Sequence, residues 1–487
     1  MNNNDIKYNN PNANHINSIP NINNSNNNNN IHTVTIESID LEGKGVTHIE
    51  GKTVFIDGAL PDEVARIEIY KKKPNFDKAR LIELITPSPH RITPECPNFG
   101  VCGGCSMQHL DFESQIHNKQ KALLDNLKYI GQVTPLSVIP PLLGKPFAYR
   151  HRARLSVRHV AKKGGVLVGF HEKSSSFVAD MNQCLILPNP ISNLIPTLKT
   201  VIGKLSIYNK IPQIEVAVGD KVNVLVFRIM ESLTSADELI LQSFVDEHNA
   251  IMNNPLQLWL QPKGPDTCYP FYPLNAPKLD YILPQFDIEM PYLPTEFTQV
   301  NPTINAEMIN LAISHLNPQS NEVIADFFCG IGNFTLPIAK YAKSVIGIEG
   351  SEQLVKRAQE NAKHNNLENK TNYLAVNLFK IDSNWLNTLN KMATIPEISK
   401  TVSLVANKID KWLIDPPRDG AAELISAITP DTAPSKIVYI SCNPATLARD
   451  ASVLVNVHGY TLTDAGVMNM FPHTSHVESI AVFEKTF

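Results

Sequence analysis

Apolar and polar residues alternate with a period of two along residues 32–87, which is the pattern of strands that bury one face. Turn signals, Gly43-Lys44-Gly45 among them, separate the apolar runs. The predicted strands are Thr33–Ile36, Lys52–Ile56, Glu63–Ile69 and Lys78–Ile82. Several strands in so short a span predict a small β-barrel.

The pattern is mixed between residues 91 and 300. Residues 108–130 carry apolar side chains at helical spacing and predict a helix. The runs that follow predict three strands and a helix, at Val166–Phe170, Ile214–Val218, Val222–Ile229 and Ala236–His248. An α+β domain is expected here.

Strands and helices alternate regularly from about residue 305, which predicts an α/β fold with a largely parallel, Rossmann-like sheet. The helix Asn305–Leu316 comes first. The predicted strands are Glu322–Phe328, Ser344–Ile348, Tyr373–Val376, Lys411–Ile414, Lys436–Ile440, Thr461–Val467 and His476–Phe483.

Length and composition divide the chain further. The 487 residues are enough for two to four domains, and 43% of them are hydrophobic. Residues 1–30 contain sixteen asparagines, too polar a tract to form a core. We therefore expect a disordered tail at 1–31, a barrel at 32–90, a central domain at 91–300 and the α/β domain at 301–487.

The net charge of −4 excludes a globally basic nucleic-acid binder, so any RNA surface must be local. One basic cluster ends the barrel, at Lys71–Lys73, Lys78 and Arg80. A second lies in residues 146–163, which carry six Lys or Arg and no Asp or Glu. Strand alternation predicts one phosphate-binding face made of Arg150, Arg152, Arg154 and Arg158. Tyr149 is expected to stack on a base.

Seven cysteines, an odd number, argue against a secreted disulfide framework and for a reducing compartment. The chain has neither a run of eighteen apolar residues nor a signal-peptide pattern, so we expect a cytoplasmic protein without membrane contact. Three of the thiols, Cys96, Cys102 and Cys105, follow a C-x5-C-x2-C spacing in a glycine-rich loop. Cys184 is the candidate fourth ligand, and the spacing leaves zinc and an iron–sulfur cluster both open.

Polar side chains capable of binding a ligand end five successive strands of the α/β domain. The first is Asp326 with its Cys329-Gly330-Ile331-Gly332 turn, and Glu349 ends the next strand twenty-three residues later, where an acidic residue usually binds ribose. The remaining three are Asn377, Asp415 and Cys442. Cys442 by itself would be read as a buried thiol. Five such residues on one sheet edge instead predict a methyltransferase domain that uses S-adenosylmethionine.

Five motifs make the chain resemble the RNA uracil-C5 methyltransferase family from about residue 32 to the C-terminus. They are residues 297–301 (FTQVN), 326–335 (DFFCGIGNFT), 414–418 (IDPPR), 441–444 (SCNP) and 473–479 (HTSHVES). The barrel is similar to a TRAM domain. Barrel and cysteines together resemble the branch acting on 23S ribosomal RNA. The tail and the stretch near 385–410 depart from the usual family length.

The resemblance implies roles for individual residues. Cys442 would be the nucleophile that adds to uracil C6, and Glu478 the base that removes the C5 proton. S-adenosylmethionine would be bound by Gln299, Phe328, Asn333, Glu349, Asn377 and Asp415. A [4Fe-4S] cluster would be bound by Cys96, Cys102, Cys105 and Cys184.

This chemistry carries further expectations. The Cys442 environment should favour the thiolate, because the thiolate is the nucleophile. Asp415 could hold polar atoms of the uracil ring, and Phe297 could stack on it. The substrate would be a flipped uridine in a single-stranded loop or bulge of 23S rRNA, bound by a monomer.

Alternatives remain open. The modified base could be another uridine of rRNA or tRNA. An amino-methyltransferase is disfavoured because Arg418 stands where such enzymes place an aromatic residue after Asp415-Pro416-Pro417. The chain could also be a non-catalytic RNA-binding or redox-sensing iron–sulfur protein, but such a protein would not need Cys442 and Glu478.

Overall fold

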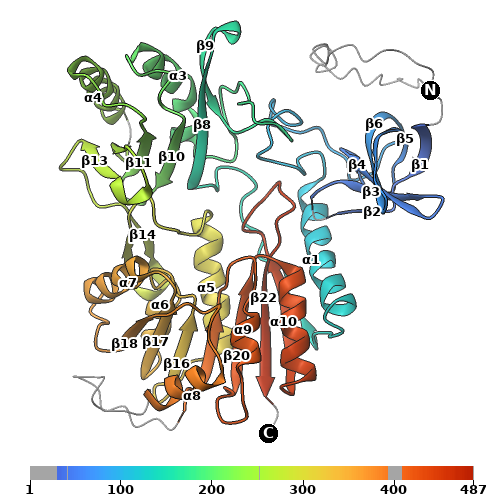
Figure 1. The fold of residues 1–487 in the computed structure, drawn as a ribbon, viewed down its shortest axis with the longest axis vertical. Helices are drawn as coiled ribbons and strands as arrows, with labels where there is room; N and C mark the ends of the chain where they lie inside the picture. Colours follow the sequence, from blue (N-terminus) through green and yellow to red (C-terminus); the bar gives the residue numbers. More distant parts are fainter. Residues whose placement is uncertain (1–29, 41, 252, 393–407, 486–487) are drawn as a thin grey trace, which may run out of the picture. The chain divides into compact units, whose positions relative to one another are not determined.

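The computed structural model describes residues 30–40, 42–251, 253–392 and 408–485 (Figure 1). The predicted tail therefore lies outside the described residues except for its last two positions, and so do residues 393–407 of the stretch near 385–410. The chain forms two compact units: one contains residues up to Ser38 together with Gly45–Pro87, and the other contains Ile39–Lys44 and everything from Ser88 onward.

The first unit is built on a six-stranded sheet in the order β1-β5-β6-β4-β3-β2. Its strands are β1 Ile31–Thr35, β2 Ser38–Ile39, β3 Gly45–Ile49, β4 Lys52–Asp57, β5 Val64–Lys72 and β6 Phe76–Thr86. The four predicted strands are confirmed, but β2 and β3 were not predicted. In β3 the inward positions are Gly45 and Thr47, so no apolar alternation marks the strand.

The central part of the second unit carries a sheet in the order β13-β12-β11-β10-β8-β9. Its strands are β8 Arg152–Val160, β9 Gly165–Gly169, β10 Gln213–Val218, β11 Asn223–Arg228, β12 Leu256–Gln261 and β13 Tyr269–Tyr272. The helices of this part are α2 Asn189–Ser192, α3 Leu194–Lys204 and α4 Ser235–Asn249. Helices α3 and α4 pack on each other and against this sheet. A hairpin of β14 Asp280–Leu283 and β15 Ile288–Pro291 follows.

The C-terminal part is an eight-stranded sheet in the order β18-β17-β16-β19-β20-β22-β21-β7. Its strands are β7 Ser137–Val138, β16 Val323–Phe327, β17 Ser344–Glu349, β18 Thr371–Ala375, β19 Lys411–Ile414, β20 Lys436–Ser441, β21 Tyr460–Met468 and β22 Glu478–Lys485. The helices are α5 Pro302–Leu316, α6 Thr335–Ala339, α7 Glu352–His364, α8 Ser383–Met392, α9 Ala422–Ser426 and α10 Pro444–Asn456. Strands β16 to β20 run parallel, whereas β22 is antiparallel to both β20 and β21.

The parallel strands β16, β17, β19 and β20 are buried on both faces, which explains their nearly continuous apolar sequences. The segment before residue 300 contributes to this sheet as well, because β7 pairs with β21 and α1 Phe112–Tyr129 packs beside α10 (Figure 1). Among the described residues, no helix is both long and apolar enough to cross a membrane.

Candidate active site

The carboxyl ends of five parallel strands meet at one edge of the C-terminal sheet. Phe327 is in register with Ile348 of β17 and with Ile414 of β19. Because these registers align the strand ends, the residues that follow them lie along the same edge. The expected site residues at this edge are Phe328, Glu349, Asn377, Asp415 and Cys442.

The prediction that Asp326 is one of the ligand-binding residues at the strand ends is wrong. Its side chain is fully buried within β16, one residue before the strand ends, and its Oδ2 accepts a hydrogen bond from the Thr335 hydroxyl of α6. Burial raises its pKa to about 8. Asp326 therefore joins strand to helix, and four edge residues remain from the predicted five.

The turn after β16 is shaped by its backbone. Gly330 and Gly332 have φ values of 55° and 94°, and Phe328 also has a positive φ of 63°. The Gly330 N–H donates to Glu349 Oε2 at 3.2 Å, and the Ser351 N–H donates to Glu349 Oε1 at 3.0 Å. The Glu349 carboxylate thus holds the turn beside it at the edge.

The other residues expected to bind the cofactor differ in how far their polar groups are already hydrogen-bonded within the protein. Asn333 Oδ1 accepts hydrogen bonds from the Tyr281 hydroxyl at 2.7 Å and from Asn305 Nδ2 at 3.1 Å, so its amide is already bonded within the protein. Asn377 is exposed, and its Oδ1 accepts from the Phe379 N–H. Gln299 is half-buried just before α5.

Cys442 and Glu478 face each other across two paired strands. Ser441, the last residue of β20, is in register with Ser479 of the antiparallel strand β22. Cys442, which follows Ser441, therefore lies opposite Glu478, which precedes Ser479. Cys442 is half-buried, whereas Glu478 is only 3% exposed. A strand pairing therefore joins a thiol and a carboxyl that are thirty-six residues apart in the sequence.

Burial raises the pKa of all three acidic groups of this site. Burial, followed by the charge of Asp415, raises the pKa of Glu478 well above its usual range. Burial raises the pKa of Asp415 to about 7. The Cys442 pKa is raised to about 11 by burial and by the Glu478 and Asp415 carboxylates, against the lowering effect of Arg418. The surroundings of Cys442 therefore favour the thiol, contrary to the expectation of a thiolate-favouring environment.

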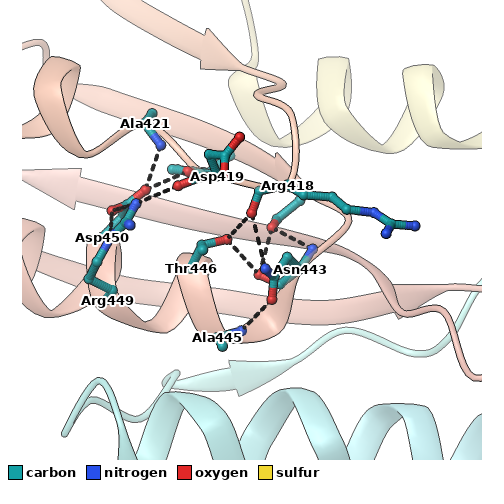
Figure 2. A network of polar contacts seen from close by, with 10 residues as sticks. Arg418, Asp419, Ala421, Asn443, Ala445, Thr446, Arg449 and Asp450 are labelled. Atoms are coloured by element: carbon teal, nitrogen blue, oxygen red, sulfur yellow. Dashed lines mark hydrogen bonds and ion pairs between the residues drawn. The ribbon is translucent and has the colours of Figure 1, made fainter. Parts of the chain in front are cut away.

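Polar contacts fix the loop after β19 against the first turns of α10 (Figure 2). The Arg418 carbonyl accepts from Asn443 Nδ2 at 3.0 Å and from Thr446 Oγ1 at 3.1 Å. Buried Asp450 accepts from the Ala421 N–H at 2.8 Å. The two loops that carry the acidic groups are thereby held together.

The high pKa of Cys442 gives a direct prediction about its reactivity. Alkylation of Cys442 by iodoacetamide, followed by peptide mass mapping, should be slow at neutral pH and should rise toward a midpoint near the pKa of about 11. Arg418→Gln should move the midpoint to higher pH, because the lost cation stabilises the thiolate. Arg418→Lys is the matched control. Fast alkylation at neutral pH would contradict this electrostatic description.

The four cysteines expected to hold a metal centre line one pocket: Cys96, Cys102, Cys105 and Cys184. The pocket is otherwise mostly apolar, with Phe99, Phe170 and Met181 in its wall. All four are free thiols. Burial and the neighbouring thiols raise the pKa of Cys105 and Cys184 to about 12. Within the described ranges, no group of three or more His, Cys, Asp or Glu side chains has the spacing that holds a single metal ion.

Strand β8 confirms the predicted alternation for Arg152, Arg154 and Arg158, because Ala153, Leu155 and Val157 between them are buried. Arg150, the fourth arginine of the prediction, precedes the strand and is half-buried. Two of those arginines already have protein partners. Arg152 Nη2 donates to the Pro294 carbonyl at 2.6 Å, and Arg154 forms an ion pair with Glu215 at 3.1 Å.

The two aromatic residues expected to stack on a base differ in exposure. The prediction for Tyr149 is wrong, because the ring is only 4% exposed and its hydroxyl donates to the Pro472 carbonyl at 2.9 Å. Phe297 is 69% exposed, which excludes a role in the core.

Sequence reasoning missed the residues that hold residues 469–477. We call these residues the base segment because they precede Glu478, the expected base. Lys119 of α1 is buried, and its Nζ donates to Asn469 Oδ1 at 2.8 Å and to the Phe471 carbonyl at 2.9 Å. Burial lowers its pKa to about 7. The available signal was a long polar side chain in the apolar stripe of α1, since a buried polar group needs a partner. The pattern could not identify a partner 350 residues away.

The chain is similar to known proteins over nearly its whole length. It is 57% identical over 451 residues to the Chromobacterium violaceum protein named 23S rRNA (uracil(1939)-C(5))-methyltransferase RlmD, covering 93% of this chain and 84% of that protein. It is 52% identical over 453 residues to the Nitrosospira multiformis protein of the same name, covering 93% and 98%.

Family models and a solved structure agree with these relatives. A model described as tRNA (Uracil-5-)-methyltransferase matches residues 278–486, and a TRAM domain model matches residues 27–82. The fold is similar to that of Pyrococcus abyssi tRNA (uracil-54, C5)-methyltransferase in complex with S-adenosyl-L-homocysteine. That match has a TM-score of 0.68 at 21% identity and covers 93% of this chain and 100% of that one. The chain therefore belongs to the S-adenosylmethionine-dependent RNA uracil-C5 methyltransferase family.

Proposed function

We propose that this protein methylates C5 of a uridine in 23S ribosomal RNA, at the position 1939 for which its relatives are named. The observation that carries the proposal is the register of β20 and β22, which sets Cys442 opposite Glu478 at the edge that carries Glu349. Uracil C5 is a weak nucleophile, so the reaction needs both a thiol and a base next to the methyl donor.

The edge residues fit a bound S-adenosylmethionine. Glu349 would accept hydrogen bonds from the ribose hydroxyls, and the tight turn at Gly330 and Gly332 leaves room for close approach of the ligand. Phe328, Asn377, Gln299 and Asp415 would complete the pocket, and Asn333 would bind after exchanging one of its present partners. The bound cofactor supplies an electrophilic methyl group, and its sulfur takes the electron pair of the broken S–CH3 bond.

The residues of the chain carry out the remaining steps. Cys442 Sγ gives its proton to water and, as the thiolate, bonds to uracil C6, which pushes the C5=C6 electron pair toward C5 and O4. The resulting nucleophilic C5 then attacks the methyl group. The Glu478 carboxylate removes the C5 proton, and the electron pair of that C–H bond re-forms C5=C6 and expels the Cys442 thiolate.

Asp415 has a specific use in this scheme. With a pKa raised to about 7, it carries a proton in much of the population near neutral pH and can donate a hydrogen bond to a uracil carbonyl. Negative charge develops on that oxygen when Cys442 adds to C6. A donor placed there stabilises the charge where it forms.

RNA would be held by local basic surfaces. Lys71 of β5 is in register with Lys78 of β6, and like charges on facing positions repel unless an anion such as phosphate lies between them. Arg158 and Lys162 are exposed, without ion-pair partners in the described part of the chain. Exposed Phe297 could stack on the uracil, which would be flipped from a single-stranded loop or bulge. We expect a monomer acting in the cytoplasm.

The test is methylation of RNA fragments in vitro. Purified protein with labelled S-adenosylmethionine should form 5-methyluridine at one position in a 23S rRNA fragment that contains position 1939. A fragment with that uridine changed to cytidine is the control. Label that appears only in tRNA, only at another rRNA position, or on an amino group would overturn the proposal.

The cysteine pocket is proposed to hold a [4Fe-4S] cluster, because four free thiols line one mostly apolar pocket. Protein purified without oxygen should absorb broadly in the visible range and contain about four iron atoms per chain. Cys184→Ser should lower the iron content, whereas Cys268→Ser, outside the pocket, should not. Colourless protein with stoichiometric zinc would reject the cluster.

A further inference from the structure

Gln115 of α1 is a completely buried glutamine whose amide bonds two separate segments of the chain. Its Oε1 accepts a hydrogen bond from the His473 N–H of the base segment at 3.0 Å. Its Nε2 donates to the Met107 carbonyl at 3.0 Å and to the Leu110 carbonyl at 2.8 Å. One side chain therefore joins the base segment to the stretch that follows the cysteine loop.

Backbone hydrogen bonds also join the base segment to the stretch that follows the cysteine loop, this time with a group of the base segment as the acceptor. The N–H groups of Ser106 and Met107, directly after Cys105, both donate to the His473 carbonyl at 3.0 Å. On its other side this stretch is bonded to the cysteine loop, because the Cys96 N–H donates to Gln108 Oε1 at 3.2 Å. His473 is therefore hydrogen-bonded on both sides: its N–H donates to Gln115, and its carbonyl accepts from the two residues that follow Cys105.

The position of His473 matters because it lies five residues before Glu478. His473 has a positive φ of 63°, which a non-glycine residue adopts only when its surroundings require it. Its ring stacks on Phe147 with centroids 4.6 Å apart. The base segment thus enters β22 from a turn that these contacts hold in one conformation.

We propose that Gln115 is a positioning residue for the base, and that through it the cysteine loop and Glu478 are mechanically coupled. This rests on the proposed function, in which Glu478 removes the C5 proton after Cys442 has bonded to C6. Gln115 acts through the base segment and touches neither reacting group. Loss of its hydrogen bonds leaves Cys442 on β20 in place and moves only the carboxyl of Glu478.

The coupling predicts that a change at Gln115 slows release of the methylated RNA but not formation of the protein–RNA adduct. In Gln115→Leu, formation of the protein–RNA adduct should change by less than about threefold, whereas release of the methylated RNA should slow by about 10- to 100-fold. The adduct should therefore accumulate on denaturing gels. Gln115→Glu keeps an acceptor for the His473 N–H and should recover part of the release rate.

The matched control is Gln120→Leu. Gln120 also lies on α1, but its amide accepts from the Val467 N–H of β21 rather than from the base segment. It should leave both steps unchanged. Cofactor affinity, iron content and thermal unfolding of each variant report whether the fold is intact. If Gln115→Leu does not fold, Gln115→Glu with its partial slowing of release carries the test.

The outcomes separate the inference from the proposed function. Adduct accumulation in Gln115→Leu and in Glu478→Gln, but not in Gln120→Leu, supports the inference. Accumulation in Glu478→Gln alone, or equal loss of both steps in Gln115→Leu, overturns it and leaves Glu478 as the base. No accumulation in Glu478→Gln overturns the role of Glu478 itself.

Discussion

Replacing Cys442 with alanine is expected to abolish methyl transfer, with a loss of about 10⁴-fold or more in the single-turnover rate, because the thiol that adds to C6 and thereby activates C5 is gone. Alanine keeps the end of β20 intact and removes only the thiol. The affinity for S-adenosylmethionine should stay within about twofold, because the cofactor edge around Glu349 is unchanged.

Single-turnover methylation of an rRNA fragment, together with calorimetric measurement of cofactor binding, tests this prediction. Cys268→Ala is the control, since Cys268 is a half-buried free thiol outside both the active site and the cysteine pocket. A Cys442→Ala protein that still methylates at a rate near the wild-type rate would show that the reaction does not use this thiol.

Replacing Glu478 with glutamine is expected to stop the reaction after methyl transfer. Glutamine has the same shape but cannot accept the C5 proton, so turnover should fall by about 10²- to 10⁴-fold. The Cys442–C6 bond should then persist, and protein and RNA should migrate together under denaturing conditions.

The matched control for this variant is Glu484→Gln. Glu484 lies on the same strand, at the opposite end, and pairs with Lys436 at 2.7 Å on the surface. It should turn over normally and leave no adduct. A Glu478→Gln protein that turns over slowly without any trapped RNA would place the block before Cys442 attacks, and another residue would then be the base.

The sheet and the thiol at its edge could be predicted because the information is local. Strands β17, β19 and β20 are apolar runs that lead into Glu349, Asp415 and Cys442, and the register of a parallel sheet brings such ends together. Asp326 shows the limit of this rule. Because β16 ends one residue after Asp326, this side chain is buried and bonded to α6 instead of lying at the ligand-binding edge.

The contacts that hold the base segment could not be predicted, since they join residues more than 300 positions apart. The arginines beside Tyr149 predict an RNA contact for its ring, yet its hydroxyl donates to the Pro472 carbonyl. Neither the raised pKa of Cys442 nor the burial of Glu478 has a signature in composition or spacing. Both arise from the tertiary fold, which places three acidic groups in one poorly hydrated site.

The most direct test of the central claim is the chemical identity of the trapped adduct. Glu478→Gln protein is incubated with S-adenosylmethionine and a 23S rRNA fragment, digested with protease and nuclease, and analysed by mass spectrometry. We predict a peptide whose Cys442 sulfur is bonded to C6 of a uridine that already carries the new C5 methyl group. A bond to any other residue, or methylated RNA released with no protein attached, would contradict the account.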